Sequence, residues 1–136
     1  MIVLVDTPIW SLLLRRQRHT LAAHQSAQLQ RLRDLVTGDR ARLLGAVRQE
    51  LLSGVRSSEQ FARLQAELRV FPDVELEIAD YEIAAETSNT CRARGIAVTH
   101  IDMLLCSIAL RRGWAIYTAD RDFERYARYL PITLYA

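Results

Sequence analysis

The sequence predicts an α/β protein in which helices cover a parallel sheet. Short apolar runs rich in β-branched residues alternate along the chain with longer segments of helical periodicity. Strands that are separated by helices favour parallel pairing, because the chain must cross over the sheet before the next strand begins. The 136 residues, half of them hydrophobic, suffice for one core, so we expect a single domain over residues 1–136.

The N-terminal half is expected to begin with a buried strand. Residues 2–5, IVLV, form a β-branched run that ends at Asp6, as in strands buried on both faces. Thr7 and Pro8 then have the residue types of an N-cap and a first helical position, which predicts a helix through Leu14. Apolar spacing predicts further helices at residues 20–36, 47–54, 57–69 and 78–94, with weak strands at 41–46 and 74–76.

The last third of the chain has the clearest pattern. Residues 102–112 are apolar almost all round up to two terminal arginines, so this helix is expected at the centre of the fold. Gly113 provides a helix stop. A buried strand, a short helix and a closing strand follow at 114–118, 121–127 and 132–135.

Composition excludes several classes of protein. All eighteen basic residues are arginine and the formal net charge is +2, so no lysine is present for a Walker A motif or a Schiff base. Cys91 and Cys106 lack a CxxC or Cys/His pattern, which argues for buried thiols rather than a zinc site. No apolar stretch approaches the roughly 20 residues of a membrane span, and no basic segment precedes the first apolar run. We therefore expect a cytoplasmic protein with no membrane partner.

Two carboxylates follow predicted strands. Asp6 comes directly after residues 2–5, and Asp120 follows the strand at 114–118. In parallel α/β sheets, ligands bind beyond the carboxyl ends of the strands, which favours a functional site there. Aspartate in this position is also a common helix cap or turn former, so both roles remain open.

Glu50 and Asp102 are two further candidates. Glu50 lies among apolar residues of a predicted helix, which indicates that it points toward the core, where an unpaired carboxylate is costly. Arg48 or a more distant arginine could neutralise it. Asp102 begins the most apolar helix, where it suits either a site or a helix cap aided by the helix dipole.

Four carboxylates in one crevice would repel one another, which raises their pKa values or requires a cation. Oxygen ligands alone favour Mg²⁺ or Mn²⁺ over zinc. Such an ion suits phosphodiester hydrolysis, because it lowers the pKa of a bound water and neutralises charge on the leaving oxygen.

The four acids and their surroundings resemble the PIN-domain family, and most closely its VapC-type toxins, the ribonucleases of toxin–antitoxin modules. The matching stretches, which span nearly the whole chain, are VLVDTPIW (3–10), QELLSG (49–54), HIDMLLCSIAL (100–110) and YTADRDFERYA (117–127). No stretch is specific alone, but the four in this order and spacing are. The resemblance implies a three-layer α/β/α sandwich with a central, mainly parallel sheet, and an Mg²⁺- or Mn²⁺-dependent endoribonuclease.

The same resemblance assigns roles to single residues. It implies a catalytic, metal-binding quartet of Asp6, Glu50, Asp102 and Asp120. The first and third would ligate the metal directly, and the second and fourth would support it or orient the attacking water. Thr118 matches an accessory hydroxyl position, and Asp122 an accessory acidic position that could also cap the next helix.

The resemblance further implies a homodimer and a VapB-like antitoxin that sends a basic side chain into the acidic pocket. The helices expected at 20–36 and 57–69 are candidate surfaces for these contacts, although each could equally pack on the sheet. The weak candidates for RNA contacts are Arg15, Arg16, Arg18 and Arg121. Such a basic run is also typical of a solvated face, and Trp10 could stack on a base or pack in the core.

Two other functions stay open. A phosphatase with Asp6 as its nucleophile would want a lysine and a second acid close behind the first, but Thr7 and Pro8 follow instead. A catalytically inactive PIN-like module that binds RNA or regulates would tolerate the loss of an acid, yet all four are present. Loops of tRNA and of ribosomal RNA both suit such a site, so the RNA target also stays open.

Overall fold

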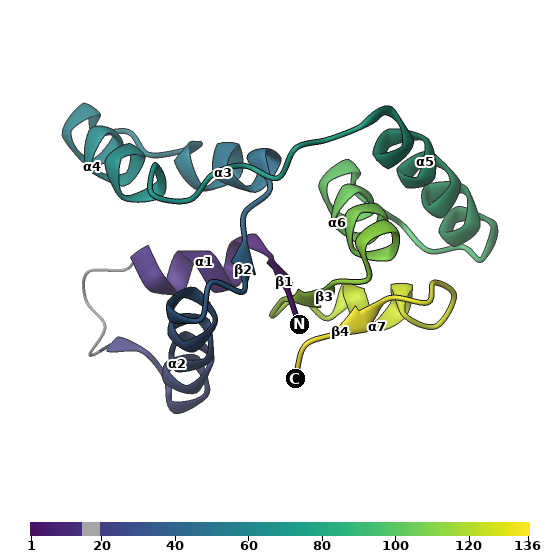
Figure 1. Ribbon diagram of the computed structural model, residues 1–136, viewed down its shortest axis with the longest axis horizontal. Helices are drawn as coiled ribbons and strands as arrows, with labels where there is room; N and C mark the ends of the chain where they lie inside the picture. Colours follow the sequence, from purple (N-terminus) through teal and green to yellow (C-terminus); the bar gives the residue numbers. More distant parts are fainter. Residues whose placement is uncertain (15–19) are drawn as a thin grey trace.

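Parallel strands form the centre of the fold in the computed structural model, which describes residues 1–14 and 20–136. The strands are β1 (Val3–Val5), β2 (Ala41–Arg42), β3 (Ala115–Tyr117) and β4 (Thr133–Leu134). Their order in the sheet is β2-β1-β3-β4, and every pairing is parallel. Helices flank this sheet on both sides, so the expected α/β/α architecture is confirmed (Figure 1).

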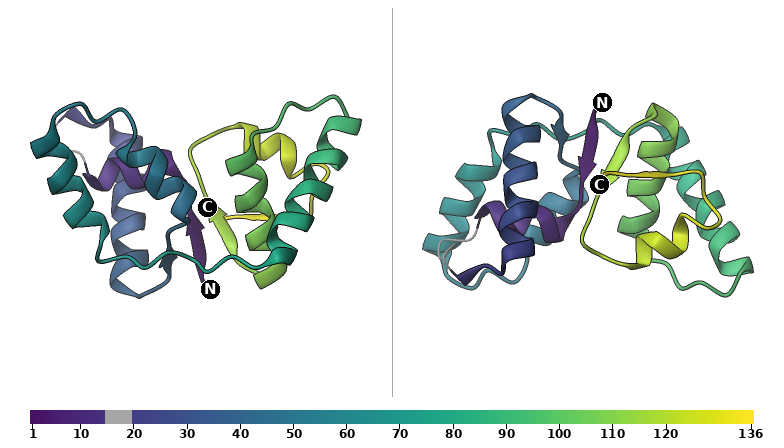
Figure 2. Two further views of the ribbon diagram at one scale, coloured as in Figure 1. Left: turned by 90° about the horizontal axis from the view of Figure 1, so that it is seen from above. Right: turned by 90° about the horizontal axis from the view of Figure 1, so that it is seen from below.

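The helices lie in two groups. They are α1 (Thr7–Leu14), α2 (Ala23–Thr37), α3 (Gly45–Leu52), α4 (Ser58–Leu68), α5 (Ile78–Ala93), α6 (His100–Arg112) and α7 (Asp122–Tyr126). Figure 2 shows α1 to α4 on one side of β1, and α5 to α7 with β3 and β4 on the other. Every predicted helix is present, with its ends shifted by about three residues at most. Within the described ranges, no helix is long and apolar enough to cross a membrane.

The strand order places a topological switch point between β1 and β3. From β1 the chain passes through α1 and α2 to β2 on one side, whereas β3 lies on the other side of β1. Val5 is in register with Tyr117, so the two strands end at the same level. A switch point of this kind is where open parallel sheets bind ligands.

Apolar side chains of β1, α1 and α6 form much of the core. All three residues of β1 are fully buried, as a central parallel strand requires. Trp10 is fully buried too, and its ring centroid lies 4.8 Å from that of Phe71. Its burial stabilises the packing of α1 by about 2–3 kcal/mol, and Trp10 therefore packs in the core rather than offering a surface to a base.

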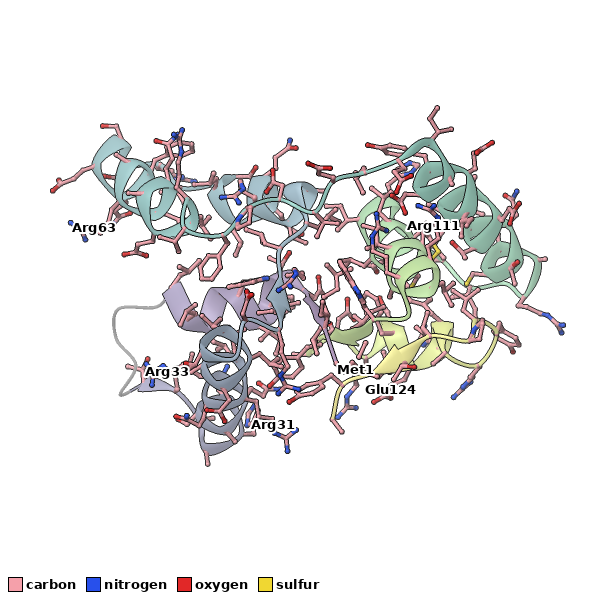
Figure 3. The ribbon with its side chains drawn as sticks, viewed as in Figure 1. Met1, Arg31, Arg33, Arg63, Arg111 and Glu124 are labelled. Carbon is pink, nitrogen blue, oxygen red and sulfur yellow. The ribbon has the colours of Figure 1, made fainter. Side chains whose placement is uncertain are left out.

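A buried carboxylate joins the start of α5 to the end of α6. Asp80 is fully buried, and its Oδ1 accepts hydrogen bonds from Arg111 at 2.9 Å and Arg112 at 2.8 Å. The hydrogen bond from Arg112 is the main reason that the pKa of Asp80 lies well below its usual value, although burial opposes the shift. Figure 3 shows Arg111 between α6 and α5. These pairs fix the two helices against each other.

Two local predictions were wrong. Residues 74–76 form no strand, because a single isolated bridge between Leu43 and Asp73 is the sheet pairing of this segment. Thr7 is the first residue of α1 rather than its N-cap, because the backbone carbonyl of Asp6 accepts the amides of the first turn. The hydroxyl of Thr7 is therefore available for another partner.

The two cysteines are buried thiols, as the sequence predicted. Cys91 and Cys106 are both buried and neither forms a disulfide. Burial is the main cause that raises the pKa of each thiol, so both stay protonated at neutral pH.

Replacement of Asp80 by alanine is expected to destabilise the protein by about 3 kcal/mol or more, because it leaves two arginines without their shared partner at a partly buried position. The free energy of unfolding in urea measures the effect. Glu82→Ala, at an exposed position of the same helix, is the matched control and should change the stability by no more than about 0.5 kcal/mol. Equal stabilities for the two variants would contradict the anchoring role of Asp80.

Candidate active site

The site begins where β1 and β3 end. The amide of Asp6 donates to the carbonyl of Tyr117 at 2.9 Å, which extends the parallel ladder one residue beyond β1. Thr118 then lies opposite Asp6, and its hydroxyl donates to Asp6 Oδ2 at 2.7 Å. The backbone pairing therefore brings together two residues that are 112 positions apart in the sequence.

Asp6 is a buried acid whose charge is only partly compensated. Its side chain is 5% exposed, and its Oδ1 accepts the amide of Thr7 at 2.8 Å. Burial raises the pKa of Asp6 to about 6, the hydrogen bonds from Thr118 and Thr7 oppose the rise, and the charges of Asp102 and Glu50 add to it. Asp6 therefore lies within electrostatic range of two other acids of the predicted quartet.

Asp102 lies in the first turn of α6, where it is not needed as a cap. The helix begins at His100, two residues earlier than expected, and Thr99 is its N-cap, with a hydroxyl that accepts the amide of Asp102 at 3.1 Å. The carboxylate of Asp102 instead accepts the hydroxyl of Tyr126 at 2.7 Å. Burial raises the pKa of Asp102, and the negative charge of Asp120 adds to this rise.

Asp120 and Asp122 complete an acidic cluster with Asp102. One carboxylate oxygen from each of the three lies within 4.8 Å of the other two. The amide of Asp120 donates to the hydroxyl oxygen of Thr118 at 3.0 Å, and Asp120 Oδ1 accepts the amide of Asp122 at 2.9 Å. Asp120 thus binds the amide of the first residue of α7 and still takes part in the cluster. Asp122 is that first residue and does not cap the helix, because the N-cap position is Arg121.

Glu50 does not point into the core, and this expectation was wrong. Glu50 is exposed, because Val47 is the residue that α3 buries against the rest of the fold. Arg48 does not neutralise it, since Arg48 forms an ion pair with Asp73 at 2.8 Å. The partner of Glu50 is the hydroxyl of Thr7, which donates to Oε2 at 2.7 Å.

The two threonines link the acids into one hydrogen-bonded chain. Thr7 bonds both Glu50 and Asp6, and Thr118 bonds both Asp6 and Asp120. Asp102 approaches this chain from α6, as its electrostatic effect on Asp6 indicates. The four acids of the predicted quartet are therefore all present at one end of the sheet, although Glu50 lies at its exposed edge.

The donor set fits a hard divalent cation. The groups that converge are carboxylate oxygens, and the described residues bring no histidine or cysteine into the cluster. Carboxylates at this spacing repel one another, and a divalent cation removes the repulsion while accepting oxygen ligands. Asp102, Asp120 and Asp122 could share such an ion, and Asp6 adds a fourth carboxylate whose pKa is raised by the charge of Asp102.

The arginines predicted to contact RNA are only partly described. Arg15, Arg16 and Arg18 lie outside the described residues. Arg121 is exposed next to Asp120 and has no ion-pair partner within the described ranges.

Tyr126 is a site residue that the sequence did not reveal. Tyr126 is 1% exposed. In the sequence it follows Phe123 by three residues, a spacing that indicates only an ordinary apolar position of a short helix. Its contact with Asp102 spans 24 residues, which no local spacing rule detects. The hydroxyl of a buried tyrosine usually has a hydrogen-bond partner. That general rule is the one signal in the sequence that could have pointed to Tyr126 as a site residue.

Comparison with known proteins agrees with this geometry. A model of the PIN domain family matches residues 3–129, so the chain belongs to the PIN domain family. No curated protein matches the sequence significantly.

Several solved structures share the fold. One described as a toxin–antitoxin complex from Klebsiella pneumoniae is 16% identical, with a TM-score of 0.64 over 89% of this chain and 89% of that chain. FitAcB from Neisseria gonorrhoeae is 16% identical, with a TM-score of 0.77 over 99% of this chain and 97% of that chain. VapBC2 from Rickettsia felis, bound to a DNA fragment from its promoter, is 17% identical, with a TM-score of 0.72 over 99% and 98%. VapBC-1 from nontypeable Haemophilus influenzae is 16% identical, with a TM-score of 0.67 over 99% and 97%. At these identities the similarity establishes the fold.

Stability without metal should fall as the pH rises from about 4 to about 7. The pKa of Asp6 is raised from 3.8 to about 6 and that of Asp102 is also raised, so over this range the folded protein binds more protons than the unfolded chain. For Asp6 alone the loss is as much as about 3 kcal/mol. Urea unfolding in EDTA at several pH values measures it.

In the same experiment, Asp6→Asn should flatten much of this pH dependence, because the amide does not titrate. Glu86→Gln, an exposed change on α5, should leave the pH profile as in the wild type. A stability that increases steadily over this pH range in the wild type would show that the acids are not held as the geometry requires.

Proposed function

We propose that the protein is a metal-dependent endoribonuclease and the toxin of a toxin–antitoxin module. The observation that carries this proposal is the hydrogen-bonded chain of acids and threonines at the switch point between β1 and β3. A structural role alone would not need several carboxylates close enough to raise one another's pKa values, because such repulsion costs stability.

The acids have separate tasks in this proposal. Asp102, Asp120 and Asp122 would hold Mg²⁺ or Mn²⁺, and Asp6 would complete the site at the end of β1. When bound, the ion would supply an activated water for in-line attack and a positive charge for the leaving oxygen. Glu50, at the exposed edge, would orient the water or accept its proton.

The hydroxyl groups keep the acids in position. Thr118 and the amide of Thr7 occupy one oxygen each of Asp6, which limits how its carboxylate can turn. Tyr126 occupies Asp102 Oδ2, so Asp102 Oδ1 is the atom left for a ligand. Fixed carboxylates of this kind reduce the reorganisation that catalysis requires.

The fold also supports a protein partner. One of the similar structures is described as a toxin–antitoxin complex, and we infer that this chain likewise has a VapB-like antitoxin in the cytoplasm and forms a homodimer. A basic side chain of an antitoxin could replace the charge of the metal among the carboxylates, because arginine binds carboxylates in a bidentate manner. An inactive RNA-binding module is the second candidate. An Asp6-nucleophile phosphatase is disfavoured because the chain has no lysine and Thr7 and Pro8 follow Asp6 where a second acid is expected.

Asp6→Asn is expected to lower RNA cleavage in Mg²⁺ or Mn²⁺ on the order of 100-fold or more, because it removes one charge from the site and keeps its shape. Cleavage of labelled RNA under single-turnover conditions measures this loss, and growth after induced expression measures the toxicity that should disappear with it. Asp34→Asn, an exposed change on α2, is the matched control and should cleave like the wild type. Undiminished cleavage by the Asp6 variant, or cleavage that persists in EDTA, would reject the metal site proposed here.

Tyr126→Phe should weaken Mn²⁺ binding about 10-fold, because partners that orient metal ligands affect affinity on this scale. Titration calorimetry with Mn²⁺ alone measures the affinity without any reaction. Tyr117→Phe is the matched control, since its hydroxyl donates to the carbonyl of Gln28 at 2.9 Å, away from the acids. Each variant should lose about 1 kcal/mol of stability, but only the first should lose affinity. Equal affinities would assign Tyr126 a purely structural role.

A further inference from the structure

A second feature, a pocket of about 310 Å³, lies beside the acids. Thr118 and Asp120 form the wall that it shares with the acidic site, and Gln28 of α2, Glu124 of α7 and Tyr135 complete its polar lining. In the view of Figure 3, Glu124 lies near the lower edge of the right-hand half of the molecule. A ligand in this pocket would therefore touch the same residues that hold the acids.

The frame of the pocket is rigid. The carbonyl of Gln28 accepts the hydroxyl of Tyr117, and the amide of Tyr135 donates to the carbonyl of Ile116 at 2.8 Å. The rings of Tyr135 and Tyr117 pack edge to face, with centroids 5.3 Å apart. These contacts fix the backbone and the ring plane of Tyr135 before any ligand arrives.

The polar ends of the lining side chains, by contrast, have no partner within the described ranges. No hydrogen bond or ion pair there occupies the amide of Gln28, the hydroxyl of Tyr135 or the carboxylate of Glu124. The guanidinium of Arg121, which also lines the pocket, is unpaired in the same sense. Small-ligand pockets combine a fixed apolar wall with a few such convergent polar groups.

Two arginines lie in or near the pocket. Arg121 lines it next to Asp120, and the lining also holds the carboxylate of Glu124. Arg31, one helical turn after Gln28, is close enough to Tyr117 that its charge opposes the rise in the pKa of Tyr117, which burial causes. Figure 3 shows the side chain of Arg31 extending away from α2. Guanidinium groups bind phosphate well, so these arginines suit the backbone of a nucleotide held in the pocket.

We propose that this pocket binds the base of an unpaired RNA nucleotide next to the phosphate that is cleaved; the proposal rests on the nuclease function proposed above. Tyr135 stacks on the base, and Gln28 and Glu124 hydrogen-bond its Watson–Crick edge, which is how proteins read single-stranded RNA. The volume is at the lower end of the range for ligand sites, so it suits one base. The pocket, rather than the acids, then determines which sequence is cut.

The test is the sequence profile of cleavage on a pool of random-sequence RNA oligonucleotides, read by sequencing the product ends. The wild type should favour certain bases at one position beside the cut. Gln28→Ala and Glu124→Gln should each change that preference about tenfold, the scale of one good base contact. Tyr135→Leu, which keeps apolar volume, should lower kcat/KM about tenfold for all bases. Gln30→Ala on the same helix and Glu86→Gln on α5 are the matched controls and should keep the wild-type profile.

The outcomes separate this proposal from the nuclease function. Metal-dependent cleavage that Asp6→Asn abolishes supports the function whatever the profile is. An unchanged profile in both Gln28→Ala and Glu124→Gln would overturn the pocket proposal alone. If the wild type does not cleave, the nuclease proposal fails, and anisotropy of labelled hexanucleotides in EDTA then decides the pocket: equal affinities of wild type and Tyr135→Leu overturn it. Pocket variants could also keep the wild-type cleavage profile but no longer be inhibited by a co-expressed antitoxin. That result would show that the pocket binds a side chain of the antitoxin, and it would overturn the base-binding proposal.

Discussion

The parallel pairing of β1 with β3 is the constraint on which the site depends. Because Val5 is in register with Tyr117, the hydrogen bond from the Asp6 amide to the Tyr117 carbonyl closes the ladder at its end. The two chains leave the sheet at the same level, and this proximity lets Thr118 reach Asp6. The remaining acids are arranged around that contact by α3, α6 and α7, so the chemistry follows from the strand order.

The site carries an electrostatic cost that the rest of the fold offsets. Asp6 and Asp102 are buried acids with raised pKa values, and neither forms an ion pair with the residues that the structure describes. At the other end of α6, Asp80 has two arginine partners and a lowered pKa. One end of α6 is therefore held to α5 by the ion pairs between its two arginines and Asp80. The other end of α6 carries Asp102, whose negative charge has no such partner within the described ranges. Stability given up at a functional site and supplied elsewhere is common in proteins.

Hydroxyl donors do much of the positioning that basic residues do in other acidic sites. Thr7, Thr118 and Tyr126 each donate to a carboxylate at 2.7 or 2.8 Å through a hydroxyl or backbone amide. Neutral donors orient an acid without cancelling its charge, so the acids keep their attraction for a cation. Arg121 lines the neighbouring pocket and forms no ion pair within the described ranges, and a positive charge there suits a polyanion.

The sequence by itself determined the order of the helices, the buried first strand and the acids that follow strands, because these depend on local periodicity and on residue types at element ends. It predicted one strand too many, at 74–76. It did not determine that Glu50 faces solvent, that Thr99 caps α6 or that Tyr126 holds Asp102. Which face of α3 is buried depends on the packing of the whole domain, and the contact of Tyr126 with Asp102 joins residues that are 24 positions apart. Tertiary structure decided these points, because burial and side-chain partners are set by elements that are distant in the chain.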